Sequence, residues 1–112
     1  MFERIKGVIS MEHIIEVVER NIHEIKEVSE KCDCDIKILE IVNEQPYAVI
    51  LCEKEFVADV LSDYILIGNR TATIVINVSR LKSCVANGEK GEVSILLDDS
   101  RKIKINCNYV LQ

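Results

Sequence analysis

The chain has 112 residues, of which 48% are hydrophobic and 29% are charged, and its formal net charge is −5. This length suits one domain with its own core, so we predict a single globular domain over residues 1–112. The acidic balance disfavours nucleic acid as a main partner, because phosphate binding depends on Lys and Arg. A run of about 18 apolar residues, the minimum for a membrane-spanning helix, is absent.

The N-terminal residues and the cysteines indicate the compartment. The stretch MFERIKGVIS mixes charged and apolar residues in a way that does not resemble a secretion signal. We therefore expect a cytoplasmic protein without a membrane anchor. The five cysteines are an odd number, and in the cytosol we expect reduced thiols rather than a disulfide framework.

Residues 11–31 have the pattern of a long amphipathic helix. Charged side chains dominate one side, and the other carries apolar residues at alternating spacings of three and four. This apolar stripe consists of Met11, Ile15, Val18, Ile22 and Ile25. Such a stripe usually covers a sheet of the same chain, but this one is wider than a two-strand seam requires. We therefore also predict it as a candidate interface, with one side meeting a second subunit in a two-fold homodimer.

The pattern changes to that of a β-rich part over about residues 35–111. Residues 36–42 are rich in β-branched side chains, and residues 43–46 form a turn that contains the single proline of the chain. The following stretch, 47–52, is almost uniformly apolar and predicts a strand covered on both faces, paired with the first as a hairpin. Residues 54–63 fit either a helical or an alternating pattern, and we predict a short second helix there.

Three further strands are predicted over 72–81, 93–97 and 102–111. Short turns join them, which is typical of an antiparallel meander. The last strand alternates most regularly, with Ile103, Ile105 and Cys107 inward and Lys102 and Lys104 outward. The predicted fold is α+β: an N-terminal amphipathic helix packed on a mainly antiparallel sheet of about five strands. A small β-barrel with an N-terminal helix is the alternative.

Cys32 and Cys34 are candidate metal ligands or reactive thiols, because two thiolates one residue apart in a loop can turn toward one soft metal. A closed tetrahedral site needs two more ligands, and neither a second C-x-C nor a C-x-x-C pair occurs in the sequence. The competing interpretation is packing, since free cysteine commonly behaves as a small buried hydrophobe.

A basic group near the C-terminus, Lys90, Arg101, Lys102 and Lys104, is a candidate phosphate or nucleic-acid site. Acidic neighbours weaken this interpretation, and outward lysines on a strand also serve to keep a sheet edge soluble.

Motifs for nucleophilic, phosphoryl-transfer or metalloprotease chemistry are absent from the sequence. We therefore predict no catalytic residue and no cofactor, and the enzyme question leans toward no. The leading hypothesis is a non-enzymatic protein-interaction or assembly module that self-associates or binds a protein partner. The alternatives are a Cys32/Cys34 metal or thiol site and a weak nucleic-acid or phosphate binder.

Overall fold

The computed structural model describes residues 11–31, 34–52, 55–87 and 91–109. In these residues one α-helix, α1 (Met11–Lys31), accompanies two antiparallel sheets. The larger sheet has, in spatial order, β2 (Gln45–Cys52), β1 (Cys34–Val42), β8 (Arg101–Tyr109), β7 (Glu92–Leu97) and β6 (Leu81–Asn87). The smaller sheet has β3 (Val57–Val60), β4 (Tyr64–Gly68) and β5 (Thr73–Asn77). A short 3₁₀ turn, η1 (Val78–Arg80), leads from β5 to β6.

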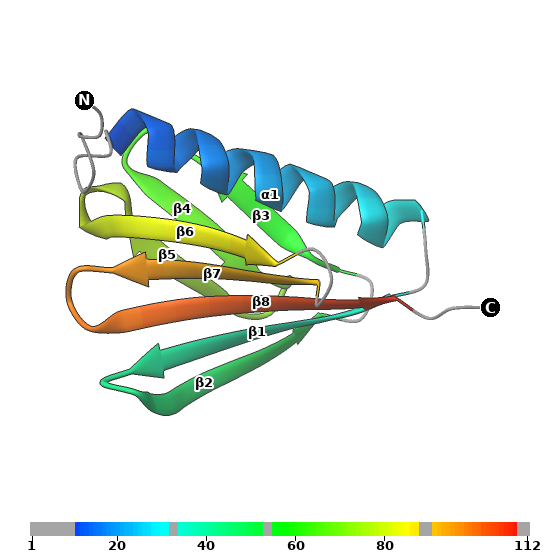
Figure 1. The fold of residues 1–112 in the computed structure, drawn as a ribbon. Coiled ribbons are helices and arrows are strands. Elements are labelled where there is room, and N and C mark those ends of the chain that lie inside the picture. The colour runs from blue at the N-terminus through cyan, green and yellow to red at the C-terminus, as the bar shows by residue number, and fades with distance from the viewer. Residues whose placement is uncertain (1–10, 32–33, 53–54, 88–90, 110–112) are drawn as a thin grey trace.

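The helix and the two sheets enclose one core. The smaller sheet lies behind the larger one, and α1 runs along the top, where it contacts β6, β1 and β3 (Figure 1). Neither sheet closes on itself. The α+β fold with a helix on a mainly antiparallel sheet of five strands is therefore confirmed, and the β-barrel alternative is wrong.

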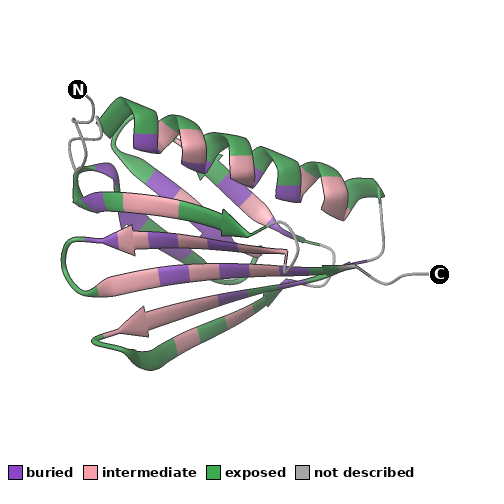
Figure 2. Ribbon diagram, in the orientation of Figure 1, coloured by how far each residue is buried: buried purple, intermediate pink, exposed green. Residues whose placement is uncertain are grey.

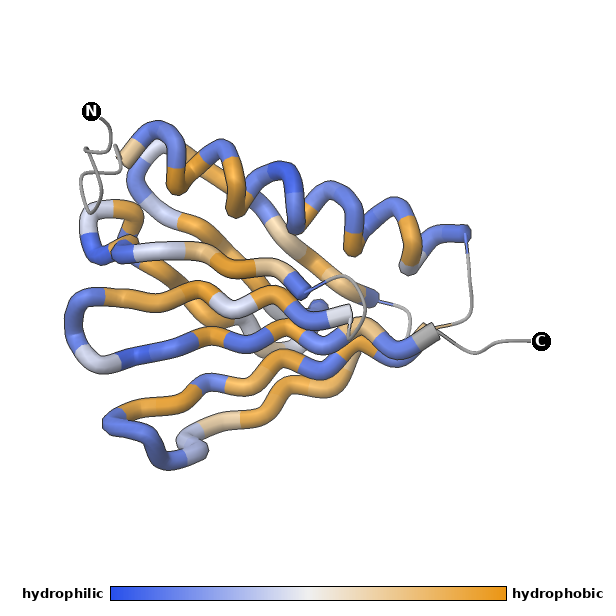
Figure 3. Tube along the Cα trace, in the orientation of Figure 1, coloured by the Kyte–Doolittle hydropathy of each residue, from blue (hydrophilic) through white to orange (hydrophobic). Residues whose placement is uncertain are grey.

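Isoleucine dominates the core. Ile38, Ile65, Ile76, Ile95 and Ile105 are completely buried, and none of the described polar or charged residues is buried with them. Buried residues alternate with partly or fully exposed ones along β5, β7 and β8, as the period of two in a strand requires (Figure 2). The hydrophobic stretches of the trace follow the same pattern (Figure 3). β-branched side chains suit these half-buried strands because their restricted χ1 angles cost little there.

The apolar stripe of α1 packs mainly into this core. Ile14, Val18, Ile22 and Ile25 are buried, whereas Met11 is 37% exposed. Ile15 is half-buried and packs at the margin of the core. Most of the stripe is thus used by the chain's own sheets.

The predicted helix over 54–63 is wrong. The structure has β3, a turn and then β4 in this region, with Leu61 donating its N–H to the Tyr64 carbonyl at 2.8 Å across the turn. Ala58 pairs with Ile67 and Val60 pairs with Ile65. These non-local pairings use the alternating pattern of the sequence and override the helical one.

Two strand predictions also need correction. The stretch 47–52 is not covered on both faces, because β2 is the edge strand of the larger sheet. The strand predicted over 72–81 ends at Asn77, whose side-chain oxygen accepts the Ser79 N–H at 3.0 Å and caps η1. Of the predicted meander, the pairing of β7 with β8 is confirmed. Its first strand is wrong, because β5 belongs to the smaller sheet and β6, for which no strand was predicted, pairs with β7.

Candidate functional site: an apolar face at the edge of the larger sheet

The β1–β2 hairpin carries several exposed apolar side chains. Tyr47 is 74% exposed, Val49 is 53% exposed and Leu51 is 63% exposed, and all three lie on β2. Leu39 of β1 stands opposite Val49 and is half-buried. We call these four residues the hairpin face. Residues 45–52 contain no charged side chain, so this face lacks the lysines with which sheet edges usually prevent association.

The strand register places the hairpin face within the outer surface of the larger sheet. One row of residues crosses all five strands: Val49, Leu39, Lys104, Ser94 and Val85. The polar residues Lys104 and Ser94 occupy the middle of this row. They separate the hairpin face from Val85, an isolated apolar residue on β6 that is 60% exposed. On the outer surface of the larger sheet, the exposed apolar side chains are therefore concentrated on the hairpin, while Leu61, Tyr64 and Val75 are exposed on or beside the smaller sheet.

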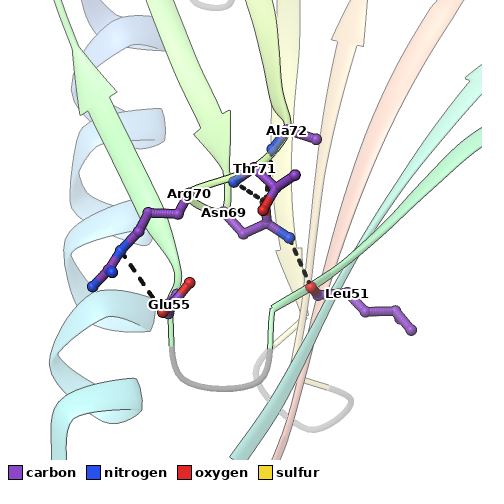
Figure 4. Close-up of polar contacts among 6 residues, drawn as sticks. All are labelled: Leu51, Glu55, Asn69, Arg70, Thr71 and Ala72. Carbon is purple, nitrogen blue, oxygen red and sulfur yellow. Dashed lines mark hydrogen bonds and ion pairs between the residues drawn. The ribbon is translucent and has the colours of Figure 1, made fainter.

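The backbone edge of β2 is protected at both ends. Near the start of the strand, Glu40 pairs with Ala48 and Ile41 pairs with Pro46, which leaves Tyr47 as an extra residue in a β-bulge. Bulges and prolines both interrupt edge pairing. At the other end, Asn69 donates its Nδ2 hydrogen to the Leu51 carbonyl at 3.0 Å (Figure 4). A partner therefore meets an open apolar face and only a short free edge.

Asn69 reaches β2 because it organises the turn between β4 and β5. Its Oδ1 atom accepts the N–H groups of Thr71 and Ala72, both at 2.8 Å, and its own N–H donates to the Ala72 carbonyl at 2.9 Å. The turn is tight at Gly68, where a Cβ atom would lie 2.1 Å from the Ala72 carbonyl oxygen. The Cys52 thiol donates to the Gly68 carbonyl at 3.3 Å. This turn thus joins the smaller sheet to the edge of the larger one.

The predicted basic site does not form one cluster in the described residues. Arg101 lies beside the inner face and binds Glu40, with its Nη2 and Nε atoms 2.7 Å and 2.8 Å from the same carboxylate oxygen. Lys104 lies on the outer face and pairs with Glu92 at 3.5 Å. Lys102 is also on the outer face, and Lys90 lies outside the described residues. The nucleic-acid or phosphate hypothesis stays a prediction, with its cations divided between two faces.

The cysteines of the described residues have packing roles. Cys34, Cys52 and Cys107 are buried, and Ile36 stands between Cys52 and Cys107 in the strand register. Burial raises the pKa of the Cys52 and Cys84 thiols, so both are protonated at neutral pH. The described residues contain no cluster of three His, Cys, Asp or Glu side chains that could hold a metal. Cys32 lies outside them, so the Cys32/Cys34 site stays a prediction, with Cys34 turned into the core.

The structure separates the residues predicted as an interface. Val18, Ile22 and Ile25 lie on the side of α1 that packs against the chain's own sheets, while Met11 and Ile15 reach the surface. The exposed apolar surface of the hairpin was missed from the sequence. Its signal is the uncharged run 45–52, of which residues 47–52 are predicted as a strand covered on both faces.

Comparisons with protein-family models, with curated proteins and with solved structures found no match to this chain. Within the described residues, no helix has the length and apolarity needed to cross a bilayer.

Proposed function

We propose that this protein is a non-enzymatic interaction and assembly module that self-associates through the hairpin face. The observation that supports the proposal is the exposure of Tyr47, Val49 and Leu51 at alternate positions of a strand without charge. Contiguous exposed apolar patches commonly mark interaction sites. An aromatic residue beside aliphatic ones is also typical of the centre of protein interfaces.

A second copy of the chain suits this face for an electrostatic reason. A two-fold interface places the same patch of each subunit against itself, so any charge at its centre would meet a like charge. The hairpin face has none. Cations stand only beside it, with Lys37 paired with Leu51 and Lys104 paired with Leu39 in the strand register. We therefore expect added salt to strengthen self-association, because it screens the repulsion between these lysines.

The size of the face sets the expected affinity. A stable interface commonly buries about 800 Å² on each partner, and a few partly exposed side chains on one hairpin supply less than this. We therefore expect a reversible dimer that forms at micromolar or higher concentrations. The cytoplasmic location stays a prediction.

Sedimentation equilibrium of the wild type and of two variants tests the proposal. Val49→Lys puts a charge at the centre of the face. Val85→Lys makes the same change in the same row of the sheet, at a residue of similar exposure. Burying the exposed half of Val49 contributes about 1 kcal/mol per subunit, so losing both raises the dissociation constant roughly thirtyfold. We expect Val85→Lys to dimerise like the wild type. A wild-type mass equal to that of the monomer up to millimolar concentration would refute self-association.

A further inference from the structure

A hollow of about 360 Å³ opens between the second half of α1 and the strands beneath it. Its lining comes from α1 and from β6, β7 and β8, on the helix side of the protein. The hairpin face belongs to β1 and β2, at the opposite edge of the larger sheet (Figure 1). Hollows of this volume fall in the range of small-molecule sites. Binding of a ligand in this hollow would therefore not depend on the proposed self-association.

The floor of the hollow is apolar. Ile25 of α1, Val93 of β7 and Cys107 of β8 are buried side chains that line it, and Val28 and Ala86 complete this surface. They belong to elements that are distant in the sequence but adjacent in the fold. A ligand with an apolar body can therefore bury that body against several elements at once, which is how most small-molecule sites obtain their affinity.

The rim of the hollow favours positive charge. Among the described residues, Glu24, Glu27 and Lys31 of α1 contribute charged side chains to it, and Glu92 also belongs to the lining but turns its carboxylate to Lys104 on the outer face of the larger sheet. The Glu27 carboxylate lies 3.7 Å from the Lys31 Nζ atom and 3.2 Å from the His23 Nε2 atom. The Glu92 carboxylate lies 3.5 Å from the Lys104 Nζ atom. Within the described part of the chain, Glu24 makes no ion pair and no hydrogen bond through its side chain.

Asn21 adds an acceptor to the same lining. Its Nδ2 atom is used locally, because it donates to the Val17 carbonyl at 2.9 Å and lies 4.0 Å from the Cys84 sulfur. The Oδ1 atom is left to accept a hydrogen bond. An acceptor beside a carboxylate, above an apolar floor, matches a ligand that carries hydrogen-bond donors and a positive charge on an apolar body.

We propose that this hollow binds a small organic cation, with its ammonium group at Glu24 and its apolar body against Ile25, Val93 and Cys107. The negative charge of the whole chain, −5, adds a favourable long-range field.

Titration of the ¹⁵N-labelled protein with 4-phenylbutylammonium at neutral pH and low salt tests this proposal. The neutral probe 4-phenylbutanol has the same apolar body. We expect saturable shifts of the Ile25, Val28 and Val93 amides with the ammonium, and binding of the alcohol about fivefold weaker. Equal affinity for the two probes, or no saturable binding of the ammonium, would overturn the proposal.

Three variants locate the binding. Glu24→Gln removes the charge and keeps the size of the side chain, and should weaken ammonium binding about threefold, as loss of an exposed ion pair does, while leaving the alcohol unaffected. Glu16→Gln is the matched control on an exposed part of the same helix and should change nothing. Ala86→Phe fills the hollow from an exposed position and should abolish binding of both probes. Unchanged ammonium affinity in Glu24→Gln contradicts the assignment whether or not Ala86→Phe folds.

Discussion

Replacing Asn69 by alanine should destabilise the protein although the residue lies at the surface. The substitution removes two hydrogen bonds inside the β4–β5 turn and the one that reaches the Leu51 carbonyl. A net hydrogen bond contributes about 0.5–1.5 kcal/mol, and the lower half of that range applies to partly exposed groups. The three together predict a loss of about 2 kcal/mol in the free energy of unfolding.

Asn69→Asp separates the two roles of this side chain. The carboxylate still accepts from Thr71 and Ala72, so the turn is kept, but it cannot donate to Leu51. We expect it to cost about 1 kcal/mol, roughly half of the alanine effect. The Leu51 carbonyl then loses its donor, which opens that end of the β2 edge.

Urea unfolding followed by circular dichroism measures both variants against the wild type. The account of Asn69 predicts the order wild type, Asn69→Asp, Asn69→Ala in decreasing stability, with similar denaturant slopes. If Asn69→Ala unfolds within about 0.5 kcal/mol of the wild type, as an ordinary surface substitution does, the turn does not hold the two sheets together as described.

Two further predictions concern the core. Ile22→Ala should lower the free energy of unfolding by about 2–5 kcal/mol, because Ile22 is buried on the sheet-facing side of α1. Glu16→Ala, on the exposed side of the same helix, should change it by no more than about 0.5 kcal/mol. Equal effects would mean that the stripe is not core. Burial raises the pKa of Cys52 and Cys84 above the usual 9.0, so the unfolded chain releases these protons at a lower pH than the folded chain. The two thiols contribute their full stabilisation below about pH 9, and this stabilisation is lost as the pH rises through their raised pKa values in the folded protein. Cys52→Ala should therefore make the free energy of unfolding in urea less dependent on pH above 9. An unchanged pH dependence would contradict burial of the Cys52 thiol as its cause.

The helix α1 and the most regular strand, β8, could be predicted because the apolar spacing of each fits only one type of secondary structure. Spacings of three and four from Val18 to Ile25 fit a helix that buries one side, and Ile103, Ile105 and Cys107 alternate with polar residues. In both cases the buried face recurs with the period of the element. The backbone geometry is then fixed by sequence neighbours alone.

The partition of the strands between two sheets could not be predicted. Residues 54–63 carry two periods at once, and the pairing of β3 with β4 decides between them. Asn77 ends one strand and begins a turn to the other sheet, which is a local signal within a pattern that otherwise continues to Leu81. Strand neighbours are non-local, so a single sequence does not determine them.

The candidate sites were hidden for the same reason. The uniformly apolar run that contains Val49 is compatible with a central strand and with an edge strand, and only the position of β2 in the sheet exposes it. The hollow brings together Glu24, Ala86 and Cys107 from three distant parts of the chain. Sequence spacing carries no record of either arrangement.

Methyl NMR spectra recorded on dilution test self-association through the hairpin face most directly. A sample labelled at Val and Leu methyl groups is diluted from millimolar to low micromolar concentration. The account predicts that the Leu39, Val49 and Leu51 methyl signals shift together along one binding curve, while the Val85 signal on the same side of the sheet stays in place. Signals of the hairpin face that do not change with concentration, or a shift of Val85 as large as that of Val49, would contradict it.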